Sequence, residues 1–271
     1  MDLDLRGGSA EALTALTERL DGVTGTSRAA ATFGDELFTV SRLFRGEAGL
    51  RRFATDASLP AEAKQGMVQQ VFGAQVGEVT LDLLTDAVGR RWTFSRDLAD
   101  VLERLSEIAV VRSAGAKVSQ VTDELFWVSR IVDGNPGLRS ALSDPARSVD
   151  DKAALVDSLF DGKALPATVT LVKQALAGTY RTVTGALAAY REVAAQTQGQ
   201  EVATVRVARP MSNADQRRLA ETLGEQYATT VHLDVVVDPD VLGGVRVEIG
   251  DDVIDGTIAG RLDDARRRLA G

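Results

Sequence analysis

An internal repeat constrains the fold of this 271-residue chain more than any other feature of the sequence. The run Asp35–Arg42 (DELFTVSR) returns 88 positions later as Asp123–Arg130 (DELFWVSR). When residues 35–87 are aligned with residues 123–175 without gaps, 18 of 53 positions are identical. Chance pairing would leave only a handful of identities, and self-similarity at one offset indicates a repeated structural unit. We therefore infer a duplicated domain.

Both copies have the apolar spacing of helices. Phe33, Leu37, Val40 and Phe44 recur at intervals of 4, 3 and 4, which places them on one helical face. Only Gly115 interrupts the apolar period between Ser95 and about Ile131, so one long or kinked helix is expected to join the copies. Further stripes include Leu81, Leu84 and Val88 in the first copy, and Val169, Val172 and Leu176 in the second. The sequence predicts a mainly α protein with two tandem bundles of five to six helices, over residues 1–110 and 111–198.

The periodicity changes in the last third of the chain. Residues 202–208 alternate as in a strand, and Ser212 with Asp215 resembles a capping box at the start of a helix. Strands are then expected at 231–237, 245–249 and, after a tight turn, 253–254, with a last helix from Thr257. Residues 199–271 are therefore predicted to form a small β-α-β-β-α module.

Composition excludes several classes of function. The net charge is −8, and the longest basic run is Arg266–Arg268, so a nucleic-acid partner is not expected. Cysteine is absent, which excludes disulfides, thiolate nucleophiles and zinc fingers. The sequence has no apolar run of about 20 residues, so direct membrane insertion is not expected. The acidic start of the chain does not resemble a secretory signal.

The residues that could carry chemistry lack the partners they would need. His232 is the only histidine and lies in an expected strand. Asp238 and Asp240 begin like a calcium loop with Gly243 at its sixth position, but the twelfth position is Ile249. No nucleotide-binding glycine motif occurs.

The acidic residues of the C-terminal third are also expected to be structural. Asp251 and Asp252 sit in a tight turn, where aspartate is common, and Asp255 is better placed to cap the last helix than to act as a general acid. We expect no catalytic residue, no cofactor, no metal and no small-molecule substrate.

The run Asp238–Thr257 (DPDVLGGVRVEIGDDVIDGT) resembles the C-terminal signature of the delta subunit family of F-type ATP synthase, whose mitochondrial members are called oligomycin-sensitivity-conferring protein. The duplicated bundle departs from members with a single bundle and is similar to the long form of high-GC Gram-positive bacteria. The residues that carry the signature are Gly243, Gly244, Gly250, Asp255, Gly256, Thr257, Arg261 and Leu262.

The resemblance implies a non-catalytic stator subunit on the cytoplasmic face of the bacterial cell membrane, held there through the ATP synthase complex. Its expected partners are the N-terminal helices of the alpha subunits and the C-terminal end of the b subunit. The second bundle adjoins the C-terminal module and is expected to cap the alpha subunits. The first would bind another alpha helix or replace part of the b stalk.

An amphipathic helix is bound most simply in an apolar groove between two helices. The residues predicted to line such grooves are Leu13, Leu16, Leu84 and Val88 in the first copy, and Leu171, Val172 and Leu176 in the second. Since the same residues have the spacing of interior core, that alternative stays open. Two other classes of function also stay open, namely a free-standing helical adaptor and a small phosphotransferase housed in the C-terminal module.

Overall fold

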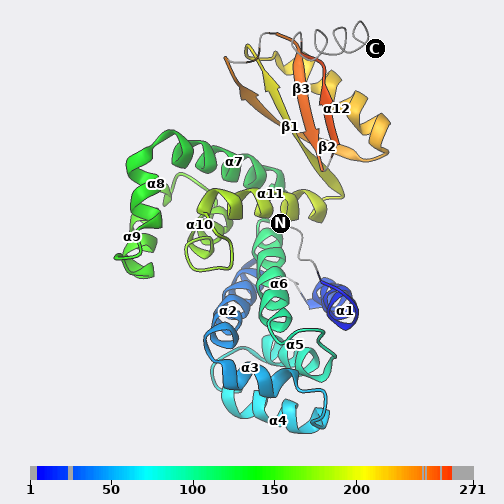
Figure 1. The fold of residues 1–271 in the computed structure, drawn as a ribbon, viewed down its shortest axis with the longest axis vertical. Coiled ribbons are helices and arrows are strands. Elements are labelled where there is room, and N and C mark those ends of the chain that lie inside the picture. The colour runs from blue at the N-terminus through cyan, green and yellow to red at the C-terminus, as the bar shows by residue number, and fades with distance from the viewer. Residues whose placement is uncertain (1–4, 24–26, 240, 242, 251, 258–271) are drawn as a thin grey trace, which may run out of the picture. The chain divides into compact units, whose positions relative to one another are not determined.

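The structure is a computed structural model that describes residues 5–23, 27–239, 241, 243–250 and 252–257 (Figure 1). The chain divides into two compact units, residues 1–193 and 194–271, and each is described by itself. The described residues contain twelve α-helices and one four-stranded mixed sheet. The prediction of a mainly helical protein with a small α+β region near the C-terminus is therefore confirmed.

The helices of the first unit repeat along the chain. Helices α3 and α8 begin and end 88 positions apart, and so do α4 and α9. The first six are α1 (Gly8–Val23), α2 (Ser27–Gly46), α3 (Ala48–Thr55), α4 (Ala61–Phe72), α5 (Glu78–Gly89) and α6 (Asp97–Ser113). After the 3-10 turn Gly115–Lys117 come α7 (Val118–Gly134), α8 (Pro136–Ser143), α9 (Val149–Phe160), α10 (Pro166–Gln174) and α11 (Val183–Thr197).

The repeat extends to hydrogen bonds between helices. In the first copy, Glu36 on α2 accepts hydrogen bonds from the backbone N–H of Gly77 (3.0 Å) and from the Thr80 hydroxyl. In the second, Glu124 on α7 accepts from the backbone N–H of Leu165 (2.8 Å) and from Thr168 Oγ1 (2.6 Å). Each carboxylate thus satisfies N–H groups at the start of α5 or α10, where the helix dipole also favours negative charge.

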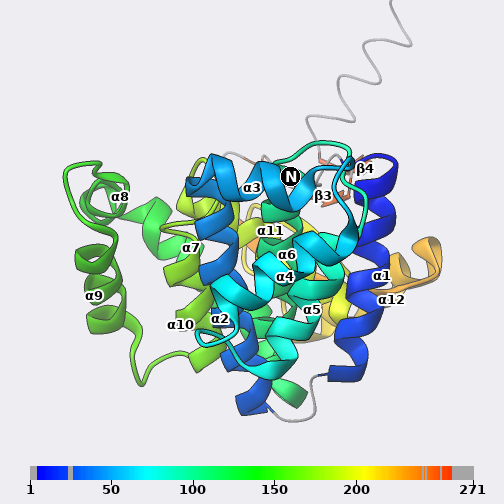
Figure 2. The same cartoon turned by 90° about the horizontal axis from the view of Figure 1, so that it is seen from below.

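Helix α6 lies at the centre of this unit and packs against α1, α2 and α10 (Figures 1 and 2). Of its seventeen residues twelve are buried, so it has no wide solvent-facing side. Gly34 on α2 lets the two backbones approach closely, because a Cβ there would lie 2.6 Å from Val110 Cγ2. Ser106 on α6 donates a hydrogen bond to the Gly34 carbonyl across this contact (2.7 Å).

Two helix boundaries differ from the simplest reading of the apolar pattern. Helix α6 stops at Ser113 and α7 starts at Val118, and Gly115 between them has φ of +57°, a left-handed conformation that glycine adopts without strain. The segment from Ser95 to Ile131 is therefore broken at Gly115 rather than continuous. Helix α10 ends at Gln174, so Leu176 lies in the following turn and not on a helical stripe.

The second unit is built on a β-α-β crossover. Strand β1 (Gln200–Val207) pairs in parallel with β2 (Thr230–Val237) through α12 (Asn213–Tyr227), and antiparallel with β3 (Val245–Ile249), which forms a hairpin with β4 (Asp252–Asp255). The sheet order is β2-β1-β3-β4. The expected capping box is confirmed, since Ser212 Oγ accepts from the Asp215 N–H (3.1 Å). The helix expected after Thr257 lies outside the described residues, so the β-α-β-β-α pattern is tested only up to the hairpin.

We expect Glu124→Ala to lower the free energy of unfolding by about 1–3 kcal/mol, because it leaves the Leu165 N–H and the Thr168 hydroxyl without their acceptor. Urea denaturation followed by circular dichroism measures the change. Arg130→Ala, at an exposed position on the same helix, is the matched control and should stay within about 0.5 kcal/mol of the unchanged chain. Equal losses in the two variants would contradict the role of Glu124.

Candidate partner-binding surfaces

The seven residues predicted to line partner grooves divide into two groups in the structure. Leu13 and Leu176 are half-buried. The others lie in the interior with at most 1 % of their surface exposed: Leu16, Leu84, Val88, Leu171 and Val172. The burial of these five fits the alternative that they are core. Contact between a partner and these five would require neighbouring helices to part, and their role in binding stays a prediction.

A buried polar network connects α6 to both copies, and the apolar pattern gave no sign of it. Glu103 on α6 is 2 % exposed and accepts hydrogen bonds from Arg45 on α2 (2.6 Å) and from the N–H and hydroxyl of Thr179, both 2.9 Å. Gly178 leaves room for this carboxylate, since a Cβ there would lie 2.2 Å from Glu103 Oε1. The network therefore ties α2, α6 and the segment between α10 and α11 together.

Glu107, one turn further along α6, is the most perturbed acid of this network. It is 1 % exposed and accepts from Arg104 (3.0 Å) and from the Tyr180 hydroxyl (3.2 Å). Burial raises the pKa of Glu107 to about 7, although the neighbouring Arg104 opposes the rise. The Tyr180 ring stands edge-on to the buried ring of Tyr190, with 5.5 Å between centroids. This joint therefore holds a carboxyl that is half protonated near neutral pH.

In the second unit, the two halves of the glycine-and-aspartate signature touch each other. Gly244 has φ of +86°, and a Cβ there would lie 2.4 Å from the Gly256 carbonyl oxygen and 2.8 Å from Thr257 Cα. The Gly256 N–H donates to the Val245 carbonyl (2.9 Å), which holds the two segments together. A side chain at position 244 is therefore excluded both by the backbone conformation and by space.

Asp255 forms a local turn with Thr257. Its Oδ1 accepts from the Thr257 N–H (2.9 Å) and hydroxyl (2.6 Å), and these bonds lower the pKa of Asp255. Gly250 closes the β3–β4 hairpin with φ of +54°. The remaining signature residues, Arg261 and Leu262, lie outside the described residues.

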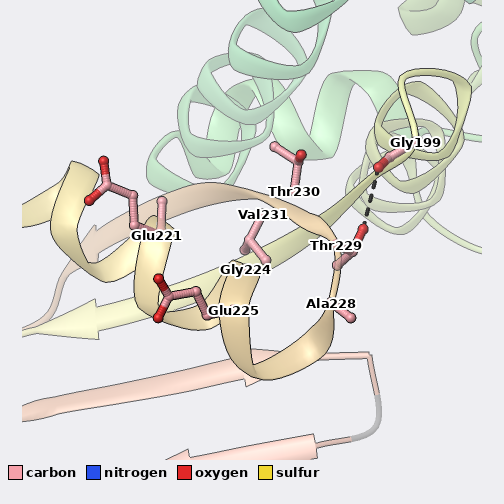
Figure 3. Close-up of a pocket in the computed structure, with 9 residues that line it drawn as sticks. Gly199, Glu221, Gly224, Glu225, Ala228, Thr229, Thr230 and Val231 are labelled. Atoms are coloured by element: carbon pink, nitrogen blue, oxygen red, sulfur yellow. Dashed lines mark hydrogen bonds between the residues drawn. The ribbon is translucent and has the colours of Figure 1, made fainter.

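Two open hollows mark the surface of the second unit. One has a volume of about 660 Å³. It is lined by the end of β1, by Pro210 and Met211, by Leu219 of α12, and by Gly243 and Gly244 of the signature. The other, of about 730 Å³, lies between the end of α12 and the start of β2, with Glu221 and Glu225 on its rim and Thr229 bonded to the Gly199 carbonyl (Figure 3).

His232 lies in β2 with Nε2 3.8 Å from Asp234 Oδ1. Within the described ranges, no group of three or more His, Cys, Asp or Glu side chains is placed to hold a metal ion. In the same ranges, no helix is both long and apolar enough to cross a membrane.

Comparison with known proteins decides the family. The family model described as "ATP synthase delta (OSCP) subunit" matches residues 105–269. The chain is 53 % identical over 268 residues to the ATP synthase subunit delta of a Nocardioides species, and the match covers 98 % of both proteins. The chain belongs to the ATP synthase delta (OSCP) subunit family. The resemblance inferred from Asp238–Thr257 is therefore confirmed.

Other relatives of the delta family match at similar length. The subunit delta of Streptomyces avermitilis is 41 % identical, with 97 % of this chain and 98 % of the relative covered. The subunit delta of Thermobifida fusca is 37 % identical, with 98 % of this chain and 100 % of the relative covered. A chain of the Toxoplasma gondii mitochondrial ATP synthase hexamer aligns with 61 % of this chain and 95 % of its own length, at 20 % identity and a TM-score of 0.40, which is too distant to carry an argument. The first copy is thus matched in these bacterial delta subunits, whereas the family model begins inside α6.

We expect Glu107 to contribute stability that is lost as pH rises. The folded chain keeps this proton up to about pH 7, whereas the unfolded chain releases it near pH 4.5. The contribution of Glu107 to the free energy of unfolding is roughly 3 kcal/mol in total. It is fully present below pH 4.5 and is lost as pH rises through 7. Glu107→Gln should flatten this part of the profile in urea denaturation between pH 5 and pH 8.5. Glu18→Gln, at an exposed position on α1, should leave the slope unchanged, and identical slopes in all three chains would contradict the assignment.

Gly244→Ala should destabilise the second unit far more than Gly250→Ala. Both positions have positive φ, which costs a non-glycine residue about 1–2 kcal/mol, but only position 244 also faces backbone atoms within 3 Å. Hydrogen exchange of the β3 amides, measured on the full chain, should accelerate by more than about tenfold over the Gly250→Ala control. Similar exchange rates in the two variants would show that the Gly244–Gly256 contact is unimportant.

Proposed function

We propose that this chain is the non-catalytic peripheral-stalk subunit of an F-type ATP synthase, linking the alpha/beta catalytic head to the membrane-anchored b subunit and resisting rotor torque. Membership of the delta family carries this proposal. We place the subunit at the cytoplasmic face of the bacterial cell membrane, as a peripheral part of the complex. In this role, its partners are proteins, and nucleic acids and small-molecule substrates are not among them.

We further propose that the helical unit consists of two tandem bundles, 1–110 and 111–198, followed by the module 199–271. The repeated bonds of Glu36 and Glu124 and the matching bounds of α3 with α8 and α4 with α9 support two copies of one design. Helix α6 packs against helices of both copies, so the boundary near residue 110 falls at the end of a shared helix rather than in a free linker.

The second copy together with the C-terminal module is proposed to make the family's usual contacts. The family model covers residues 105–269, which include α7 to α11 and the second unit but leave out α1 to α5. We assign the N-terminal helices of the alpha subunits to the second copy, with the half-buried Leu176 at the edge of the contact. The first copy is then free to bind another alpha helix or to replace part of the b stalk.

The C-terminal end of the b subunit is proposed to dock on the second unit. The hollow beside Gly243 and Gly244 supports this choice, because it combines apolar walls from Met211 and Leu219 with residues of the signature itself. A tether under torque must dissociate slowly, so nanomolar affinity, about −12 kcal/mol, is expected for the assembled contacts. Such affinity is typically concentrated in a few well-packed residues near the centre of the interface.

Size-exclusion chromatography of the full chain with detached catalytic head, and separately with the soluble part of b, tests the proposal. We expect a stable complex in both mixtures. Failure to bind either partner would overturn the stator role.

Two single variants test which copy meets the head. Leu176→Asp should weaken head binding at least about tenfold, and Leu13→Asp, at the half-buried position of the first copy, should not. Thermal unfolding of both variants checks that they fold. The opposite outcome would assign the alpha contact to the first copy.

A further inference from the structure

The segment between α10 and α11 lies over the two buried acids of α6 (Figure 1). Residues 175–182 contain no helix or strand, and Thr179 within them is exposed. The carboxylates that they contact, Glu103 and Glu107, are at most 2 % exposed. We call residues 175–182 the latch segment, because residues on it bond directly to both carboxylates.

Three hydrogen bonds attach the latch segment to these acids. The N–H and the hydroxyl of Thr179 donate to Glu103, at 2.9 Å each, and the Tyr180 hydroxyl donates to Glu107 at 3.2 Å. All three bonds end on a carboxylate of α6. A change in the charge of either carboxylate therefore acts directly on the attachment.

The acids of this cluster outnumber its bases. Arg45 pairs with Asp100 (3.1 Å) and with Glu103 (2.6 Å), and Arg104 pairs with Glu107 (3.0 Å). Three ionised carboxylates would therefore face two arginines and leave one negative charge unbalanced. A buried charge without compensation is costly, so the cluster favours keeping one proton.

Glu107 is the group that holds this proton near neutral pH. Burial raises its pKa to about 7 and outweighs Arg104 and the Tyr180 hydroxyl, which both favour the ionised form, whereas the charge of Glu103 adds to the rise. Tyr190 of α11 lies edge-on to Tyr180, and its own pKa is raised by burial and by the charge of Glu107. These four groups are therefore the ones on which the titration of Glu107 depends.

The helices packed around α6 carry further charged groups, and these have partners of their own. They are Arg45 of α2 with Asp100 and Glu103, Arg19 of α1 with Asp82 and Asp86, Arg51 of α3 with the Phe44 and Arg45 carbonyls, Glu124 of α7 with Leu165 and Thr168, and Lys173 of α10 with Asp157.

We propose that the latch segment stays closed on α6 while Glu107 carries a proton and opens when Glu107 ionises. Ionisation leaves a buried negative charge, and opening relieves it by admitting water to the carboxylate. Leu176, the half-buried residue at the edge of the proposed alpha contact, lies in the latch segment. Opening therefore also displaces part of that surface, and this consequence rests on the proposed function.

Hydrogen exchange of the Thr179 amide, measured on the full chain between about pH 5.5 and pH 8, tests the latch. After correction for the intrinsic pH dependence of exchange, we expect it to accelerate at least about tenfold, because opening returns the pKa of Glu107 from about 7 towards 4.5. The Leu37 amide in the buried part of α2 reports global unfolding and should exchange more slowly throughout. Absence of acceleration at Thr179, or equal exchange rates at both amides, would overturn the inference.

Variants of the chain locate the titrating group. Glu107→Gln keeps a neutral side chain that can still accept from Tyr180, so its Thr179 amide should not accelerate between the two pH values. Glu18→Gln, at an exposed position on α1, is the matched control and should accelerate as the unchanged chain does. Equal acceleration in both variants would assign the titration to another group and overturn the inference.

Tyr180→Phe gives an independent readout, because it removes the hydroxyl that bonds to Glu107 and keeps the ring. The Thr179 amide should then exchange at least about twofold faster at pH 5.5 and should still accelerate at pH 8. Unchanged exchange at pH 5.5 would show that the bond to Glu107 does not hold the latch segment.

Exchange in the presence of detached catalytic head separates this inference from the proposed function. At pH 8, exchange over residues 175–182 should slow at least about tenfold in the head-bound chain, because a partner that contacts Leu176 favours the closed state. A head that binds without slowing this exchange would overturn the link between the latch segment and the alpha contact. A head that does not bind would overturn the proposed function, whereas the exchange of the free chain decides the latch by itself.

Discussion

The burial of α6 on nearly all sides is the constraint on which the helical unit depends. A helix in that position cannot leave a charged side chain without partners, because an isolated charge in the interior is very costly. Glu103 and Glu107 meet this condition through Arg45, Arg104, Thr179 and Tyr180. These bonds come from both sides of α6, so the same contacts that satisfy the acids also hold the segment after α10 against α2 and α6. Such contacts suit a subunit that must transmit force, because the helix shared by the two copies leaves no flexible linker between them.

Much of the helical fold could be predicted from the sequence because apolar spacing reports directly on helix faces. The stripe from Phe33 to Phe44 lies in α2, and the capping residues Ser212 and Asp215 start α12 as expected. The acids of α6 were missed for a physical reason. An apolar period treats Glu103 and Glu107 as part of a solvated face, whereas all of their partners except Arg104 lie 58 to 76 positions away in the sequence. No local pattern contains that information.

The same reasoning explains why the partner-binding residues could not be chosen from stripes. Leu16 and Leu84 have the spacing of a helix face whether that face meets another helix of the chain or a partner, and in the structure they meet the chain itself. A more useful signal lay in the repeat. Glu36 and Glu124 are identical at the repeat offset, and in both copies this carboxylate accepts a hydrogen bond from a backbone N–H at the start of the matching helix.

The run that first pointed to the family owes its character to backbone geometry and not to a reaction. Gly244 and Gly256 stand so close that a methyl group on either would meet main-chain atoms within 3.1 Å, and Asp255 is occupied by its own turn. A motif of this kind needs no substrate to explain it, because it specifies how β3 meets the segment after β4. Each of these positions is fixed by backbone structure: Gly244 and Gly256 by the close approach of main-chain atoms, Gly250 by its positive φ, and Asp255 by its hydrogen bonds from Thr257.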